Sequence, residues 1–278
     1  MLNWLSSGVV NIAGYISPFV FLIAAFVWFV FVKRNVDIRQ NKKILIKIGV
    51  VSIAGALISP LLIIVFSGNL FPFLASSWKI IQQITNFATF KAVVSVAFRG
   101  FSMTGGILVL SVVLLFVLKD AKKLTFAILY PFPLFAALSR INCFLKGCCF
   151  GKLYNGVFAV TYPPASNVSR QHYLRSLLPS RYVESLPVHP TQLYIVFSML
   201  FLFVFVTVMN KFKVKKNIIA GTVLIGYGFL NFFIEFIREE PVVLKFFTMG
   251  QAMDIILFLL GLHLLFKVKE EDVVLKKQ

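Results

Sequence analysis

Long apolar segments alternate with short polar segments over most of the 278 residues. A helix needs about 20 mostly apolar residues to cross the hydrocarbon core of a bilayer. By this criterion the chain has about seven predicted membrane-spanning helices, near residues 15–32, 44–66, 101–118, 124–143, 190–209, 218–237 and 250–266. The pattern therefore predicts an all-α polytopic membrane protein that forms one integral membrane domain over residues 1–278.

The lysines and arginines lie in alternate connections between the predicted helices. They follow the first, third, fifth and last apolar segments, as Lys33, Arg34, Arg39, Lys42 and Lys43, then Lys119, Lys122 and Lys123, then Lys211, Lys213, Lys215 and Lys216, and finally Lys267, Lys269, Lys276 and Lys277. Cytoplasmic connections of membrane proteins carry an excess of lysine and arginine. We therefore expect the N-terminus to lie outside the membrane and the C-terminus to be cytoplasmic.

Two longer connections then face outward. Residues 67–100 mix aromatic, apolar and polar side chains, which suits a helix in the membrane interface and a packed connector equally. Residues 144–188, between the fourth and fifth spans, form an expected extracytoplasmic loop region. Within it the alternating run 156–162 is typical of a short strand. The polar stretch 166–184 has a length that is uncommon in loops unless the loop is functional or disordered.

Composition strengthens the membrane assignment. Hydrophobic residues make up 59% of the chain, whereas soluble domains have about 45–50%. The net charge of +18 comes from short basic runs between apolar segments. Such runs indicate topology signals and contacts with anionic lipids, and no nucleic-acid partner is expected. No internal repeat is visible, which argues against a transporter of the inverted-repeat type.

The most unusual stretch is S-R-I-N-C-F-L-K-G-C-C-F-G at residues 139–151, where the fourth apolar segment ends. An ionisable side chain at the membrane centre costs at least about 2.5–3.5 kcal/mol, so it usually faces a bundle interior or a watery cavity. Arg140 therefore has two interpretations. It serves a site within the bundle, or it extends from a helix end to the lipid headgroups. The glycines at 147 and 151 allow another backbone or a ligand to approach closely.

All three cysteines of the chain lie in the same stretch, at positions 143, 148 and 149. This spacing is not that of a paired C-x-x-C zinc or redox motif, and no metal ligand set is predicted. In an extracytoplasmic compartment two of the thiols can oxidise to a disulfide. Free buried thiols acting as small hydrophobic side chains are the alternative. The sequence also lacks the common hydrolase and phosphate-loop motifs, and no cofactor is expected.

Polar residues form one stripe on the sixth predicted helix, namely Tyr227, Asn231, Glu235 and Arg238. Their spacing of i, i+4, i+8 and i+11 keeps them on one helical face, and Glu235 and Arg238 are close enough to pair. Such a stripe is either an interhelical polar clamp or one wall of a binding site. Asp254 in the last segment also needs a partner, for which arginines on the outer side are candidates.

The fifth predicted helix opens on H-P-T-Q-L-Y at residues 189–194. Its His189, Gln192 and Tyr194 offer hydrogen-bonding groups at the membrane interface. His189 is either structural or a general base. In the third predicted helix, T-G-G at residues 104–106 favours close packing of backbones, with a site role for Thr104 as the alternative.

Four motifs follow one another in the order S-R-I-N-C-F-L-K-G-C-C-F-G, H-P-T-Q-L-Y, Y-G-F-L-N-F-F-I-E-F-I-R and M-G-Q. In this order, and on about seven spans, they resemble the bacterial prolipoprotein diacylglyceryl transferase family. The resemblance implies a transferase in the bacterial plasma membrane that moves the diacylglyceryl group of phosphatidylglycerol to the thiol of a lipobox cysteine. The implied partners are phosphatidylglycerol or another anionic phospholipid, the signal-peptide region of a prolipoprotein, and membrane lipids.

The resemblance also implies roles for single residues. The candidate catalytic residues are Arg140, Tyr194, Glu235 and His189. The candidate substrate-binding residues are Arg140, Cys143, Gly151, Gln192, Tyr227, Asn231, Arg238 and Thr104. Thr104 stands where the family commonly has a histidine, and Asn231 where it has a second essential arginine. His189 and Glu235 are then the remaining candidates for the base that activates the acceptor thiol.

Two other classes of protein fit parts of the pattern. A lipid or lipopeptide binder on the same scaffold, without catalysis or with an altered substrate, agrees with the changes at Thr104 and Asn231. A small transporter or channel would show uptake or conductance in liposomes. Release of glycerol phosphate from phosphatidylglycerol in the presence of a lipobox peptide distinguishes the enzyme from both.

Overall fold

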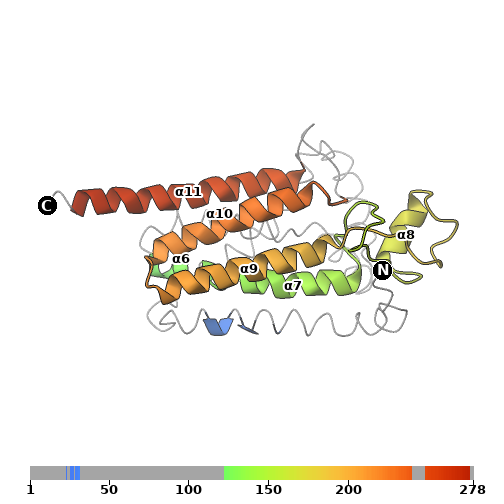
Figure 1. Cartoon of the computed structure of the whole chain (residues 1–278), viewed down its shortest axis with the longest axis horizontal. Coiled ribbons are helices and arrows are strands. Elements are labelled where there is room, and N and C mark those ends of the chain that lie inside the picture. The colour runs from blue at the N-terminus through green and yellow to red at the C-terminus, as the bar shows by residue number, and fades with distance from the viewer. Residues whose placement is uncertain (1–22, 24–25, 28, 32–121, 240–247, 276–278) are drawn as a thin grey trace, which may run out of the picture.

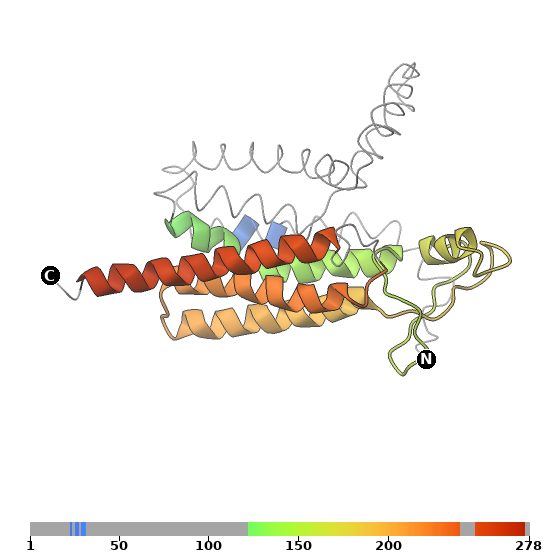
Figure 2. The ribbon, with the colours of Figure 1, turned by 90° about the horizontal axis from the view of Figure 1, so that it is seen from above.

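The computed structural model describes residues 122–239 and 248–275, together with residues 23, 26, 27 and 29–31 of an earlier helix. The two long ranges contain α6 (Lys122–Leu129), α7 (Phe132–Lys146), α8 (Asn167–Leu174), α9 (Thr191–Lys211), α10 (Lys216–Glu235) and α11 (Met249–Leu275). Figures 1 and 2 show α7, α9, α10 and α11 running lengthwise beside one another, with α8 beyond one end of the bundle.

Apolar length agrees with the predicted spans in this part of the chain. Three helical stretches are long and apolar enough to cross a membrane, namely Thr125–Lys146, Thr191–Lys211 and Lys216–Glu235. They match the predicted spans 124–143, 190–209 and 218–237 to within a few residues. The predicted span 250–266 is helical in α11, although its apolar part is shorter than the other three. The first three predicted spans lie outside the described residues apart from short pieces of the first, so the total of about seven remains a prediction.

Proline separates α6 from α7. Tyr130 and Pro131 form a turn between the two helices, and Pro133 lies in the first turn of α7. Proline has no backbone N–H and therefore breaks a helix interior, but it is well suited to a first turn, where that N–H has no partner in the helix.

The interior of the bundle is filled by apolar side chains from several helices. Ala136 of α7, Met199 of α9 and Leu224 of α10 are fully buried in one cluster. α10 and α11 pack closely at small residues, because a methyl group on Gly261 would lie 2.8 Å from the carbonyl oxygen of Gly221 and one on Gly228 would lie 2.5 Å from that of Asp254. Small residues let membrane helices pack at backbone contact, so these glycines allow α10 and α11 to cross at this distance.

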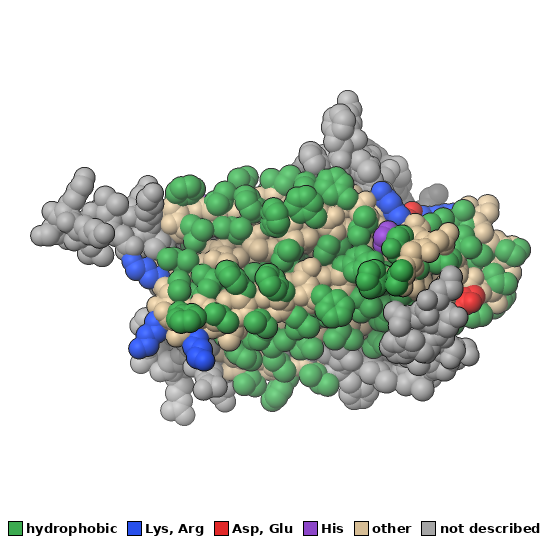
Figure 3. Space-filling view, viewed as in Figure 1, with side chains coloured by type: hydrophobic (Ala, Val, Ile, Leu, Met, Phe, Trp, Pro, Cys, Tyr) green, Lys and Arg blue, Asp and Glu red, His purple; other side chains and the backbone are tan. Residues whose placement is uncertain are grey.

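The outer face of α9 and α10 is covered by phenylalanine. Phe197 and Phe201 are 68% exposed and Phe229 is 52% exposed. Figure 3 shows hydrophobic side chains along the length of the bundle and lysine or arginine toward its ends. The lysines at 211, 213, 215 and 216, in and beside the α9–α10 connection, are exposed. An apolar band with basic residues at one end suits a bilayer with anionic headgroups.

The region between α7 and α9 is an ordered unit, and the strand predicted over residues 156–162 is wrong. Val160 forms one isolated antiparallel bridge with Val188, and no strand forms within residues 147–190, all of which are described. Residues 157 and 158 turn, and the prolines at 163 and 164 lack the N–H groups that would continue a ladder.

The predicted 166–184 loop contains a helix that the sequence pattern did not indicate. α8 begins where the hydroxyl of Ser166 accepts a hydrogen bond from the N–H of Ser169 at 3.1 Å, as N-capping serines do. Val168 of α8 packs into a second small core whose other buried members are Phe150, Val160, Tyr162 and Val188. The chain between the fourth and fifth spans is therefore folded against the end of the bundle.

Candidate functional site

The end of α7 organises the candidate site. Gly147 takes a left-handed conformation (φ 61°), and its N–H donates to the carbonyl of Phe144 at 3.1 Å. The N–H of Cys148 donates to the carbonyl of Cys143, also at 3.1 Å. This pair of bonds is a Schellman motif, which glycine favours because it lacks a Cβ. As a result the chain reverses direction and brings residues 148 and 149 back beside the last turn of α7.

Gly151 then brings three distant segments together. Its N–H donates to the carbonyl of His189 at 2.9 Å, and the N–H of Lys152 donates to the carbonyl of Ile237 at 2.9 Å. A methyl group on Gly151 would lie 2.6 Å from Cβ of His189 and 2.7 Å from the Ile237 carbonyl oxygen. Any side chain here would therefore separate the start of α9 from the end of α10.

Arg140 of α7 lies inside the bundle. Its side chain is only 6% exposed, so the interpretation that it extends to the lipid headgroups is wrong. Arg140 lies within electrostatic reach of Tyr227, Arg238 and Cys143. Its Nε atom is buried and has no hydrogen-bond partner among the described residues. A buried guanidinium with an unused donor suits the recognition of an anion.

The polar stripe predicted on the sixth span is present. Tyr227, Asn231 and Glu235 of α10 are all buried. Glu235 and Arg238 form an ion pair at the end of this helix. The buried Asp254 of α11 accepts a hydrogen bond from Nδ2 of Asn231 at 2.8 Å. Asp254 needs a partner, for which arginines were candidates, and its hydrogen-bond partner among the described residues is the Asn231 amide.

Several buried polar atoms around this stripe have no hydrogen-bond partner in the described part of the chain. They are Nε of Arg140, Oδ1 of Asn231, Nε2 of Gln251 and Oδ1 of Asp254. Gln251 is held at the start of α11, where its Oε1 accepts from the N–H of Thr248 at 2.9 Å. Native proteins pair most of their buried polar atoms. A group of unpaired donors and acceptors is therefore what a site for a polar ligand would contain.

His189 and Tyr194 form a separate group at the start of α9. Nδ1 of His189 lies 3.2 Å from the Tyr194 hydroxyl, and the imidazole stacks on the ring of Tyr154 with 3.8 Å between centroids. Burial lowers the pKa of His189 below its ordinary value, so the ring is neutral at pH 7. The contacts of the imidazole in the described part of the chain are with these two tyrosines.

The first turn of α9 holds the residues that follow α7. Gln192 Nε2 donates to the carbonyl of Cys148 at 2.7 Å and to the Tyr162 hydroxyl at 3.2 Å. The hydroxyl of Thr191 donates to the carbonyl of Cys149 at 2.7 Å. Gln192 thus holds the backbone of the 139–151 stretch in position. Its role shown by these contacts is structural.

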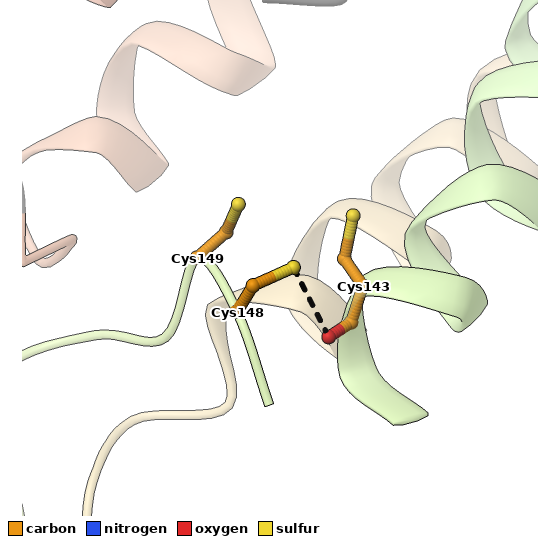
Figure 4. A group of neighbouring side chains, drawn as sticks. All are labelled: Cys143, Cys148 and Cys149. Carbon is orange, nitrogen blue, oxygen red and sulfur yellow. Dashed lines mark hydrogen bonds between the residues drawn. The ribbon is translucent and has the colours of Figure 1, made fainter. Parts of the chain in front are cut away.

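The sulfur atoms of Cys143, Cys148 and Cys149 lie within 4.8 Å of one another (Figure 4). All three cysteines are free and half-buried. The interval between Cys143 and Cys148 resembles no metal motif, and the cluster forms only because Gly147 reverses the chain. A glycine four residues after the first cysteine was the one signal in the sequence that pointed to this turn.

An apolar cavity of about 200 Å³ lies between α10 and α11. Its lining residues are Gly228, Phe229, Phe232, Phe233, Asp254, Ile255 and Phe258. Phe229 and Phe233 are more than half exposed on the outer face of α10, so the cavity opens on the surface that suits lipid. Asp254 and its partner Asn231 connect the cavity to the polar stripe.

The predicted site residues that the structure describes therefore form two groups, and Thr104 is the one predicted site residue that is not described. Arg140, Cys143, Tyr227, Asn231, Glu235 and Arg238 lie together around the ends of α7 and α10. His189, Gln192 and Tyr194 lie at the start of α9, joined to the first group through Gly151. Asp254 belongs to the first group, and Gln251 follows Gly250, which packs against Glu235. Neither Gln251 nor Asp254 was among the predicted site residues.

Comparison with known proteins gives one consistent result. A family model described as prolipoprotein diacylglyceryl transferase matches residues 8–267. The chain is 27% identical over 149 residues to the phosphatidylglycerol–prolipoprotein diacylglyceryl transferase of Ehrlichia canis, which covers 50% of this chain and 51% of the relative. The enzyme of the same name from Chlorobaculum tepidum is 26% identical over 176 residues, 60% of this chain and 55% of the relative.

A third relative of the same name, from Ehrlichia ruminantium, is 30% identical over 138 residues, 48% of each chain. The chain thus spans about half the length of the curated relatives it matches.

Proposed function

The chain belongs to the prolipoprotein diacylglyceryl transferase family, and we propose that it transfers the diacylglyceryl group of phosphatidylglycerol to a cysteine thiol of a prolipoprotein. The observation that carries this proposal is the buried Arg140, which has an unused donor deep in an apolar bundle. We further propose that the protein is a multi-pass protein of the bacterial plasma membrane and that the reaction takes place at its outer side.

Arg140 holds the phosphate of the donor lipid in this proposal. A guanidinium presents a planar fork of donors that matches phosphate oxygens. The surrounding low-dielectric bundle strengthens that attraction compared with water. Arg238 lies within electrostatic reach of Arg140, and its ion pair with Glu235 offsets its charge, so Arg140 is the main positive charge for the phosphate. Tyr227, also within electrostatic reach of Arg140, adds a neutral hydroxyl at the same position.

The cavity between α10 and α11 accommodates an acyl chain of the donor. Its phenylalanine and isoleucine lining offers no competing polar group except Asp254 at its inner end. A lipid whose chain lies in this cavity has its glycerol and phosphate near the polar stripe. The acceptor peptide approaches from the outer region, beside the point where Gly151 joins the start of α9 to the end of α10.

The transfer itself exchanges one bond for another. The acceptor sulfur, after loss of its proton, attacks the terminal glycerol carbon of the diacylglyceryl group, and the bond from that carbon to the phosphate oxygen breaks. Glycerol phosphate leaves with the electron pair, and Arg140 offsets the charge that develops on it. His189 takes the thiol proton in this scheme, because burial keeps its pKa low and its ring neutral. Glu235 is less suited, since it is already paired with Arg238.

Purified protein in detergent with phosphatidylglycerol and a lipobox peptide tests the proposal. The protein should release glycerol phosphate and produce a thioether-linked lipopeptide, and a peptide with serine in place of the cysteine should give neither. The second candidate function, a lipid binder without turnover, is favoured by the Asn231–Asp254 hydrogen bond, which occupies the position of the family's second arginine. That function predicts tightly retained lipid with no glycerol phosphate, a result that would rule out the transferase.

A further inference from the structure

The three cysteine sulfurs form a cluster with the dimensions of a metal site. In zinc sites the Zn–S distance is about 2.3 Å, so ligating sulfurs in tetrahedral geometry lie about 3.8 Å apart. The sulfurs of Cys143, Cys148 and Cys149 lie within 4.8 Å of one another. Small rotations of these side chains would bring them to the ligating distance. Figure 4 shows the side chains of Cys143 and Cys149 pointing the same way, with the side chain of Cys148 between them and directed toward Cys143.

The backbone that carries the cluster is held in place from two directions. The Schellman motif joins Cys148 to Cys143, and the first turn of α9 donates hydrogen bonds to the carbonyls of Cys148 and Cys149. Cys149 has a left-handed backbone (φ 61°), which is uncommon for a residue with a side chain. Ligands held in position before the metal arrives lose little freedom on binding it.

The charge around the cluster also suits thiolate ligands. Arg140 and Arg238 both lie within electrostatic reach of Cys149. A complex of three thiolates and one divalent cation has a net charge of −1. The nearby guanidinium of Arg140 offsets this charge. Thiolate sulfur selects soft cations such as zinc or copper(I). Among the described residues no histidine, aspartate or glutamate joins the cluster as a fourth ligand.

We propose that Cys143, Cys148 and Cys149 bind one Zn²⁺ ion, whose fourth coordination position receives the acceptor thiol. Zinc sites with three protein ligands keep the fourth position open for water or substrate. A thiol that coordinates zinc is deprotonated, and its proton leaves to His189 as in the reaction above. The sulfur keeps its electron pair for attack on the glycerol carbon. The role of the fourth position rests on the proposed function, whereas binding of the metal does not.

Metal binding is tested on the protein itself. Protein purified in detergent with reductant is stripped with a chelator and titrated with Zn²⁺, and bound metal per chain is measured by mass spectrometry. We expect one zinc per chain and protection of the thiols from alkylation, which is specific because the chain has only these three cysteines. Cys148→Ser should weaken binding by more than about 100-fold, since loss of even an outer-shell partner costs 10–100-fold.

Arg170→Ala, at an exposed position on α8, is the control and should bind zinc like the parent. The stripped parent gives an answer even if the cysteine variants do not fold. Failure of the parent to take up zinc, or alkylation at the same rate with and without zinc, overturns the site.

The role of the fourth position is tested with Co²⁺ in place of zinc. Cobalt bound by thiolates absorbs in the near ultraviolet and visible range, and a lipobox peptide should change this spectrum whereas its serine analogue should not. An unchanged spectrum overturns the acceptor role and leaves the metal site standing. If zinc binds and the peptide changes the cobalt spectrum, yet glycerol phosphate is never released, the proposed transferase fails and the metal site stands.

Discussion

At the scale of single residues, the site depends on polar groups that are buried in an apolar bundle and lack full partners. Arg140, Gln251 and Asp254 each have an unpaired buried atom in the described part of the chain. The sequence predicted the stripe that includes Asn231, because the stripe follows from helical spacing, but it left open whether Arg140 lies within the bundle or extends to the headgroups. It did not predict that Asn231 is the partner of Asp254, since hydrogen bonds between helices depend on how the helices cross.

A pH profile tests the residue proposed as the base. Only neutral His189 can accept the thiol proton, so activity should be full above its pKa and fall as pH decreases through it. Burial lowers this pKa below the ordinary value of about 6.5, so the decline should lie below that pH. His189→Gln should lower kcat/KM by about 10²–10⁴-fold and abolish this acid limb. An identical acid limb in the variant would assign it to another group.

At the scale of elements, the length of the apolar segments predicted the described membrane-spanning helices well. It gave no information on the short helix α8 or on the turn after α7. The helices Thr191–Lys211 and Lys216–Glu235 begin and end within a few residues of their predicted limits. α8 was missed because its eight residues are mostly polar and have no strong apolar pattern. The cysteine cluster was missed because its geometry arises from the left-handed Gly147 turn and from hydrogen bonds with α9.

The crossing of α10 and α11 gives a test at the same scale. Gly261→Ala places a methyl group 2.8 Å from the Gly221 carbonyl oxygen, so the helices must separate. We expect a loss of about 1–3 kcal/mol in the free energy of unfolding, as for overpacked cores. Ile256→Ala on the exposed face of α11 should change stability by only about 0.5 kcal/mol. Equal stability of Gly261→Ala and the parent in a denaturation series would show that this contact does not hold the helices.

At the scale of the whole molecule, the candidate site and the basic connection lie at opposite ends of the bundle. The exposed lysines at 211–216 mark one end, and the motif residues gather at the other end with the folded region that contains α8. Basic connections predict a cytoplasmic end, so we propose that the site lies on the outer side. This arrangement follows from the order of charges in the sequence, whereas the compact fold of residues 147–190 does not.

Orientation is tested with fused reporters. A reporter that is active only outside the membrane should work when fused after Asn155 and fail when fused after Lys213. A reporter that is active only in the cytoplasm should give the opposite pattern. If the fusion after Lys213 is the one that works outside, the proposed outer location of the site is excluded.

The most direct test of the central claim is the rate of glycerol phosphate release in Arg140 variants. A hydrogen bond to a charged group contributes about 1.5–3 kcal/mol, and each 1.4 kcal/mol is about tenfold in rate. Arg140→Ala should therefore slow transfer by one to several orders of magnitude, with Arg140→Lys between it and the parent because lysine keeps the charge without the planar fork. Arg170→Ala, which removes an exposed arginine, should transfer at the parent rate. Transfer by Arg140→Ala at the parent rate, in protein that inserts normally, would contradict the assignment of the phosphate to Arg140.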